Sequence, residues 1–506
     1  MKNSFREDPV DDLLAIGAVD QDSARIWVRS ATPGPHVLEV AEAGDAARRR
    51  VPFDVPADPA ADNLAVVTAN GLAPGRAHTV AVERPADEVL PARSIGAGRF
   101  RTAPDTAGER VTIGVMSCHQ PFDEQGRFDP DARAMLAGAD QLLRERDAAF
   151  VLMLGDQMYS DAPDGCSLYD DDHFATVAPP GRRRLLDCDA NEVRRLYRER
   201  HRRFFAMPGW RELLAGRPCY ATLDDHEVVN NWGSSPAHDS DEWAAVRDGA
   251  LRAFVDYQGS RVYDVPERLP PSLHFSFCHG PVAVMVTDMR TPRSIARGTL
   301  FGEHQLTAIE RFLRMHRDAP VAVVATSLPL FHIPKPMAYL GGLLTPDGDD
   351  FSDRAIHPAF EHEYRRICAI LRSHVERHPE QQLVLVSGDI HLGAICAIEW
   401  PGGSKAAQLI SSGVTRSPET GVALASSAAV QMSHLSPDRS GDVPSATVVE
   451  TEADNPFLNR NMGLVDVVPD GDGGYAVELS LHGLLDGGRD GGRFGEAVRQ
   501  RMHGQG

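Results

Sequence analysis

From residue 111 onward the chain alternates short apolar runs with amphipathic stretches, and this alternation limits its possible folds more than any other feature. Stretches such as "DARAMLAGADQLLRERD" and "EHQLTAIERFLRMHRD" have helical periodicity. The apolar runs cover 111–118, 148–156, 219–225, 282–290, 321–327, 383–391 and 406–413. Apolar runs joined by helices are typical of a parallel sheet with crossover helices. We therefore predict an α/β fold for this part.

The first hundred residues have a different pattern. Short β-rich runs such as "ARIWVRS", "HVLEVAEA" and "HTVAVER" are separated by Pro, Gly and Asp. This spacing is typical of an antiparallel sandwich of immunoglobulin or fibronectin type. Because 506 residues exceed one ordinary core, more than one domain is expected. We predict an N-terminal β-sandwich at 8–103, a catalytic domain at 111–480 and a polar C-terminal tail at 481–506.

Composition narrows the class of protein. The formal net charge is −20, which argues against a nucleic-acid partner because such binders need a clustered basic surface. The seven cysteines include no C-x-x-C pair, so neither a disulfide framework nor a zinc ribbon is indicated. No apolar run reaches the ~18 residues of a membrane span. With no signal-peptide pattern visible, we expect a cytoplasmic protein by default, or a periplasmic or secreted one if a leader was removed.

Side chains with metal-binding atoms stand where most of the apolar runs end. They are Cys118, Asp156, Asp225, Asp288, Ser327, and Asp389 with His391. In an open α/β sheet, ligands bind at the carboxyl ends of the strands. A single Asp at such an end often caps the next helix, but capping does not explain donors at so many ends. The series predicts a metal site.

The segment "FVLMLGDQMYSD" at 150–161 suggests what kind of metal site. Carboxylates crowded in a cleft raise one another's pKa unless a cation neutralises them. A dinuclear site, with Asp156 bridging two ions, would meet this need. Tyr159 could reach one ion, and a phenolate donor favours a strongly Lewis-acidic metal such as ferric iron. Taken alone, Tyr159 is more simply explained as an ordinary interface tyrosine.

Four motifs in order carry a family resemblance. The "GDQMY" at 155–159 matches the G-D-x-x-Y element of the purple-acid-type, calcineurin-like metallophosphatases. The segments "SCHQ" (117–120), "LDDHEVVNN" (223–231) and "SGDIHLG" (387–393) resemble motifs of the PhoD-like branch, alkaline phosphatase D and its phosphodiesterase relatives. The resemblance implies a four-layer α/β/β/α metallophosphatase sandwich with an N-terminal fibronectin- or immunoglobulin-like β-domain.

The resemblance also implies roles for single residues. Cys118, Asp156 and Tyr159 would bind Fe³⁺. Asp225, Asp389 and His391 would hold a second ion, and their oxygen-rich set suits Ca²⁺, Mn²⁺ or Mg²⁺ better than zinc. The family's separate V-x-x-H histidine has only a tentative match, His332, whose role we leave open.

Other residues of these motifs are candidates for handling the substrate. His226, together with Asp156, is the predicted catalytic pair, with His226 protonating a leaving group or stabilising a phosphoryl oxygen. Glu227 is expected to orient a neighbour. Asn231 and Arg290 are the predicted substrate-binding residues, although Arg290 could equally pair with acidic neighbours.

We therefore predict a metal-dependent phosphoesterase in which a metal-activated water attacks phosphorus in line, acting on a small-molecule or lipid-linked phosphoester. Two alternatives remain open. The same dinuclear site could hydrolyse a phospholipid or an organophosphate, with the loop at 160–190 setting the choice. The chain could also be a non-catalytic, metal-containing binding module.

Overall fold

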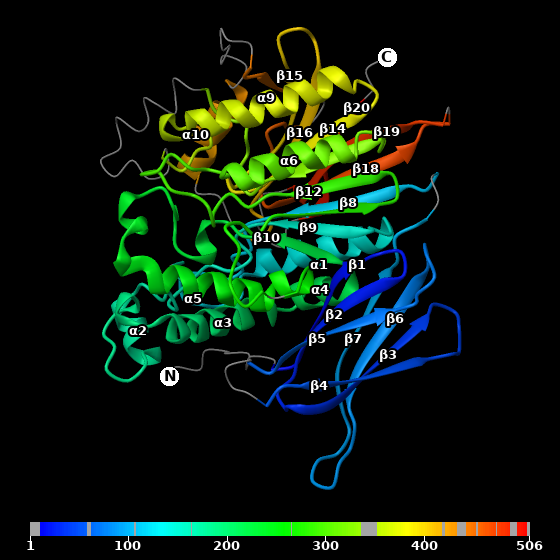
Figure 1. Cartoon of the computed structure of the whole chain (residues 1–506), viewed down its shortest axis with the longest axis vertical. Helices are drawn as coiled ribbons and strands as arrows, with labels where there is room; N and C mark the ends of the chain where they lie inside the picture. Colours follow the sequence, from blue (N-terminus) through cyan, green and yellow to red (C-terminus); the bar gives the residue numbers. More distant parts are fainter. Residues whose placement is uncertain are drawn as a thin grey trace.

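The protein consists of an N-terminal β-sandwich and a four-layer α/β/β/α unit, as the sequence predicts (Figure 1). The computed structural model describes residues 11–502 apart from 58–61, 106–107, 163, 265, 335–351, 417–419, 433–441, 452–453, 472 and 486–492.

The N-terminal sandwich has two antiparallel sheets. One contains β1 (Leu13–Val19), β2 (Ser23–Arg29) and β5 (Leu64–Asn70). The other contains β4 (Arg49–Val55), β3 (Gly34–Glu42), β6 (Ala77–Arg84) and β7 (Arg93–Arg101), in that order. Alternate residues such as Ile26, Leu38 and Val80 fill the space between the sheets. The sandwich also contacts the larger unit directly: the Trp27 indole donates to the Asp256 carbonyl at 2.8 Å.

Two sheets lie face to face in the larger unit. The first has the order β10 (Cys219–Thr222), β9 (Phe150–Leu154), β8 (Val111–Met116), β18 (Asn461–Pro469), β19 (Tyr475–Leu484), β20 (Phe494–Met502). The second has the order β11 (Phe275–His279), β12 (Val282–Val286), β13 (Val321–Ala325), β14 (Gln382–Ser387), β16 (Lys405–Ser411), β15 (Gly393–Glu399), β17 (Ser445–Val448). Strands β8, β9 and β10 are parallel, as are β12, β13, β14 and β16.

The C-terminal residues differ from the prediction. Residues 481–506 were expected to form a polar tail, but β19 extends to Leu484 and β20 pairs with it over Phe494–Met502. Strand β20 is an edge strand with polar residues at its exposed positions, and only Val498 is fully buried. Such an edge strand has little of the apolar character by which a strand is recognised in sequence.

Helices cover the outer face of each sheet (Figure 1). On the side of the first sheet lie α1 (Pro130–Glu145), α3 (Ala190–Phe205), α4 (Trp210–Gly216) and α5 (Asp241–Tyr257), with the short α2 (Asp171–Val177) beyond them. The second sheet is covered by α6 (Glu303–Met315) and α9 (Glu361–Arg377), and α10 (Thr420–Gln431) follows β16. Aliphatic residues such as Ile113, Leu152 and Val384 fill the space between the two sheets. Of the helices that the structure describes, none combines the length and apolar character that crossing a membrane requires.

Two glycines let strand ends approach each other closely. A Cβ on Gly155 (φ +94°), which follows β9, would lie 2.3 Å from Asp224 Cβ. A Cβ on Gly388, which follows β14 of the other sheet, would lie 2.3 Å from the Ser117 hydroxyl. Since real Cβ contacts are never this short, any other residue would push these strand ends apart. Gly155 therefore lets the ends of β9 and β10 meet within the first sheet, and Gly388 lets the two sheets meet at this edge.

Candidate metal centre

The backbone at this edge is unusual. Among the described residues, eight that are not glycine have positive φ, and five of these are predicted site residues: Cys118, Asp156, Asn231, Asp389 and His391. A residue other than glycine in this region costs on the order of 1–3 kcal/mol and is common at functional sites. The five positive φ values therefore mark this edge as a candidate functional site.

Cys118, Asp156 and Tyr159 form the first group of side chains. Cys118 Sγ lies 3.3 Å from Asp156 Oδ2, and the Tyr159 hydroxyl donates to the same oxygen at 3.2 Å. All three are buried. Burial raises the pKa of Cys118 to about 11 and raises the pKa values of Tyr159 and Asp156 well above their usual ranges. These groups ionise easily only if a cation takes the protons' place.

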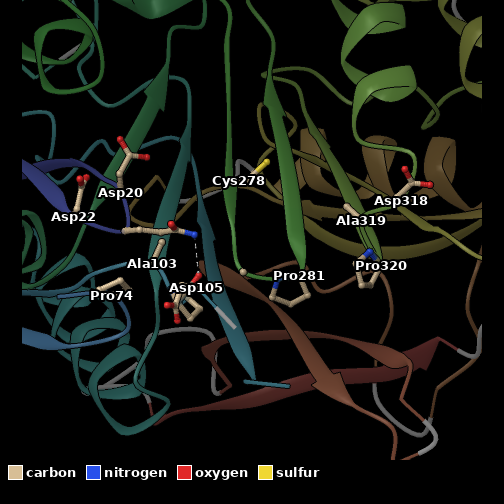
Figure 2. Close-up of a pocket in the computed structure, with 13 residues that line it drawn as sticks. Asp20, Asp22, Pro74, Ala103, Asp105, Cys278, Pro281, Asp318, Ala319 and Pro320 are labelled. Atoms are coloured by element: carbon tan, nitrogen blue, oxygen red, sulfur yellow. Dashed lines mark hydrogen bonds between the residues drawn. The ribbon is translucent and has the colours of Figure 1, made fainter. Parts of the chain in front are cut away.

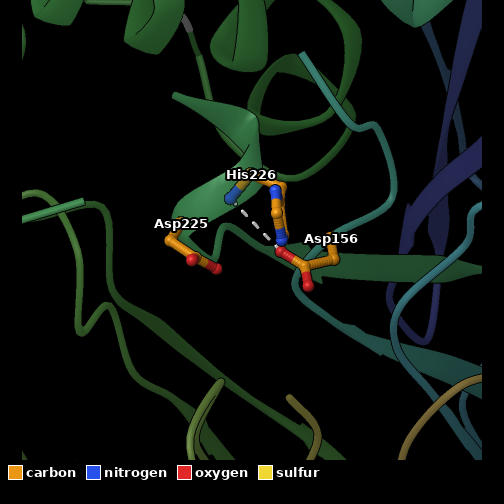
Figure 3. A group of neighbouring side chains, drawn as sticks. All are labelled: Asp156, Asp225 and His226. Carbon is orange, nitrogen blue, oxygen red and sulfur yellow. Dashed lines mark hydrogen bonds between the residues drawn. The ribbon is translucent and has the colours of Figure 1, made fainter. Parts of the chain in front are cut away.

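Asp225 links this group to the second sheet. Ligand atoms of Asp156, Asp225 and His226 all lie within 4.8 Å of one another, and Figure 3 shows the three side chains converging. Ligand atoms of Asp224, Asp225 and Asp389 meet the same limit. Because Asp225 belongs to both sets, the structure brings two adjacent acidic groups together.

The donor atoms in this region fit bound cations. Asp224 Oδ2, Asp225 Oδ1 and His391 Nδ1 are buried without a hydrogen-bond partner. Buried polar atoms normally have partners, and leaving one unpaired costs about 1–3 kcal/mol. Burial raises the pKa of Asp389 to about 8 and lowers that of His391 to about 3, so the imidazole is neutral and able to bind a metal. The two groups contain the predicted ligands Asp156, Asp225 and Asp389, together with Asp224 and His226. Neither includes Cys118 or His391, and ligation by the predicted residues stays a prediction.

Glu227 fixes the loops that carry these donors. Its carboxylate accepts backbone N–H groups of Asp156, Gln157 and Asp224 at 2.7–2.9 Å. One buried side chain thus ties the β9 loop to the β10 loop. This matches the expectation that Glu227 orients its neighbours.

His226 has an acidic partner that sequence reasoning missed. Its Nδ1 lies 2.6 Å from Asp161 Oδ1, and the other Asp161 oxygen accepts the Asn230 N–H at 2.6 Å. Burial alone lowers the pKa of His226, but Asp161, Asp225 and Asp156 together raise it well above its usual value. These carboxylates therefore favour the protonated imidazole, and the Asp161 contact holds the ring in one orientation. Asp161 stands in the same short segment as Asp156 and Tyr159, and that crowding was the available signal.

The structure does not support Arg290 as a substrate-binding residue. Its guanidinium is completely buried and pairs with Asp224 and with both oxygens of Asp353, and it donates to the Trp232 carbonyl at 3.2 Å. Arg293 also pairs with Asp353. With its donors used in this network, Arg290 instead balances the charge of Asp224 beneath the site. The other possibility considered from the sequence, pairing with acidic neighbours, is the one observed.

The remaining predicted residues lie at or beside the site. The Asn231 backbone N–H donates to Asp225 Oδ2, so its main chain supports a predicted ligand, while a side-chain role stays a prediction. His332 is buried and its Nδ1 lies 3.0 Å from the Pro329 carbonyl. Arg354, which the sequence did not single out, pairs with Asp389 at 2.9 Å. Asp288, another strand-end residue, accepts three backbone N–H groups and acts as a turn cap.

A second acidic region lies at the opposite ends of the strands. A cavity of about 730 Å³ is lined partly by residues that precede β8, β12 and β13 (Figure 2). We call it the acidic hollow, after its carboxylates Asp20, Asp22, Asp105 and Asp318. All four are exposed, and neither of the two possible cation-binding groups found among the described residues includes them.

Comparisons with known proteins identify the family and agree with the fold. The family model described as PhoD-like phosphatase matches residues 113–468. The solved structure titled "Structure of PhoD" is 15% identical, with a TM-score of 0.70, covering 99% of this chain and 91% of its own. Purple acid phosphatase PPD1 from yellow lupin (Lupinus luteus) is 11% identical, with a TM-score of 0.55, covering 97% and 74%. At these identities the two structures show the fold alone. No curated protein matches the chain.

Proposed function

Because the chain belongs to the PhoD-like phosphatase family, we propose that it is a metal-dependent phosphoesterase whose centre is the pair of acidic groups joined by Asp225. The observation that carries the proposal is the convergence of Asp156, Asp225 and His226 from separate strand ends. The substrate would be a small-molecule or lipid-linked phosphoester.

The donor chemistry suggests which cations are held. Cys118, Asp156 and Tyr159 offer a thiolate, a carboxylate and a phenolate, a set that suits Fe³⁺. Asp225, Asp389 and His391 offer mainly oxygen atoms, which suits Ca²⁺, Mn²⁺ or Mg²⁺. When bound, the cations would supply Lewis acidity, lowering the pKa of a water molecule and neutralising charge on the phosphoryl group.

His226 would handle the proton of the leaving group. Its imidazole is held by Asp161 through Nδ1, which leaves Nε2 to face the substrate. A protonated imidazole can donate to the departing alkoxide oxygen or to a phosphoryl oxygen. Asp161 both orients the ring and stabilises its charge, as an acidic partner does for a catalytic histidine elsewhere.

The His226–Asp161 pair also bears on the alternative of a non-catalytic binding module. Metal retention alone does not require a carboxylate that orients the His226 ring, as Asp161 does. The pair therefore favours catalysis. The choice between a simple phosphoester and a phospholipid or organophosphate depends on substrate tests.

The test is hydrolysis of bis(p-nitrophenyl) phosphate and p-nitrophenyl phosphate by iron-grown protein supplied with Ca²⁺ or Mn²⁺. Asp156→Asn should abolish turnover because it removes the carboxylate shared by Cys118, Tyr159 and His226. Asp147→Asn is the matched control: Asp147 is also an Asp at positive φ (+48°), but its side chain is 74% exposed in a surface turn.

Metal-dependent turnover in the wild type and in Asp147→Asn, but not in Asp156→Asn, would support the proposal. Absence of turnover on both substrates by protein shown to contain its metals would contradict it. The ratio of diester to monoester turnover would identify the preferred substrate class.

A further inference from the structure

The turn that follows β16 is fastened to the first metal group. Backbone N–H groups of Val414, Thr415 and Arg416 donate to the carbonyls of Ser117 and Cys118 at 3.0–3.4 Å. Gly413 (φ +81°) permits the turn, because a Cβ there would lie 2.7 Å from the Arg416 carbonyl. The backbone of Arg416 is therefore fixed beside the predicted iron ligand Cys118.

The Arg416 side chain extends over the site. Its guanidinium carbon lies 5.9 Å from the centre of the Tyr159 ring, within the range of a cation–π contact. Its Nε is buried and has no hydrogen-bond partner, while the residue as a whole is only partly buried. The turn that carries Arg416 also packs against the second predicted metal group, because a Cβ on Gly413 would lie 3.7 Å from His391 Cα.

Other arginines around the centre already have acidic partners. Arg290 and Arg293 pair with Asp353, Arg354 pairs with Asp389, and Arg200 pairs with Asp164. Arg416 differs: no hydrogen bond or ion pair joins its guanidinium to any residue that the structure describes. A partly buried cation that is paired with no described carboxylate is available to an anion from outside.

We propose that Arg416 binds the terminal oxygens of the substrate's phosphoryl group, the role that the sequence had suggested for Arg290. The inference rests on the proposed function. A guanidinium presents parallel N–H groups that match two oxygens of a phosphate, and its partial exposure gives substrate access. The fixed turn places this guanidinium on the Tyr159 and His391 side of the centre. No acidic residue that the structure describes pairs with it there.

The role has a consequence for substrate class. A phosphomonoester carries up to two negative charges on three terminal oxygens, whereas a diester carries one charge on two. Coulomb attraction to a fixed cation scales with the charge of the anion. Arg416 therefore favours monoesters over diesters, and its removal shifts the preference toward diesters.

Two variants test this inference. Arg416→Gln removes the charge and Arg416→Lys keeps it without the fork. We expect KM for p-nitrophenyl phosphate to rise roughly 10- to 100-fold in Arg416→Gln, as for loss of hydrogen bonds to a charged group, and less in Arg416→Lys. Binding of inorganic phosphate to the metal-loaded protein, measured by isothermal titration calorimetry, should weaken by a similar factor. KM for the diester should change less.

Arg195→Gln is the matched control, because Arg195 is exposed on α3 and pairs with Glu199. Iron and Ca²⁺ per chain should be unchanged in every variant. Unchanged phosphate affinity and KM in Arg416→Gln would overturn the inference. A fall in kcat or in metal content without a change in KM would also overturn it, because Arg416 would then act through Tyr159. Inactivity of the wild type on both substrates would instead count against the proposed function.

Discussion

Two acidic regions lie at opposite ends of the parallel strands of the two sheets, and they differ in almost everything except charge. At the carboxyl ends, Asp156, Asp224 and Asp225 are at most 3% exposed, and Asp225 lies within ligand distance of each of the other two. At the amino ends, the four carboxylates of the acidic hollow are exposed. The figures show the difference: side chains converge in Figure 3 and are spread around a cavity in Figure 2.

The comparison shows that acidic residues near one another do not make a metal site by themselves. An exposed carboxylate is solvated by water, so a cation gains little by binding it. A buried carboxylate has lost that solvation and gains much from a cation. Burial, positive φ and unpaired donor atoms, rather than the number of acids, distinguish the candidate centre.

The largest difference between the two regions is expected when the carboxylate shared by both acidic groups is substituted. Asp225→Asn should lower kcat/KM by at least ~10³-fold, because it removes negative charge where two cations are expected. Asp22→Asn, in the acidic hollow, should leave kcat/KM unchanged. Steady-state kinetics on both nitrophenyl substrates would measure this, and equal losses in the two variants would contradict the assignment.

Removal of the metals should destabilise the protein through the carboxyl-end region alone. A ligand bound only by the folded state adds about 3–4 kcal/mol when it is present at 100–1,000 times its Kd. We therefore expect a chelator to lower the Tm of the wild type and of Asp22→Asn in calorimetry. In Asp225→Asn the chelator should have a much smaller effect. A Tm that does not respond to chelation in metal-loaded wild type would count against the centre.

The Asp161–His226 pair predicts that activity at the candidate centre depends on pH. Activity that needs a protonated His226 is present below the raised pKa of this residue and is lost as the pH rises through it. Asp161→Asn removes a negative charge, so the alkaline limb of the pH–rate profile should move to lower pH. We also expect kcat to fall roughly 10- to 100-fold with metal content unchanged. An unmoved alkaline limb would show that His226 is not the titrating acid.

The smallest effect is expected in the acidic hollow. The double variant Asp20→Asn, Asp22→Asn alters exposed side chains, so the free energy of unfolding should change by no more than ~0.5 kcal/mol. Metal content and turnover should equal those of the wild type. A loss of metal or of turnover would show that the acidic hollow affects the candidate centre, which would contradict the distinction between the two regions.

The sequence predicted the fold class and most of the residues that converge. Several apolar runs that ended in a donor became strands whose ends lie at the site, as for Cys118, Asp156 and Asp389. Asp288 had the same pattern but caps a turn. Arg290 was placed at the right strand end, but its side chain turns under the site toward Asp353. The position of a residue at a strand end therefore predicted that it lies near the site. It did not predict the direction in which the side chain points.

The sequence by itself determined the strands, the order of the motifs and the types of donor atom, because hydrophobic periodicity and residue chemistry are local properties. Only the tertiary structure decided which charges pair. Arg290 lies beside Asp224 and Asp353, Arg354 beside Asp389, and Arg416 beside Tyr159 without an acidic partner. These contacts join segments 35 to 257 residues apart. Such pairings depend on how the two sheets stack and where the glycines let them approach, and no local pattern encodes that geometry.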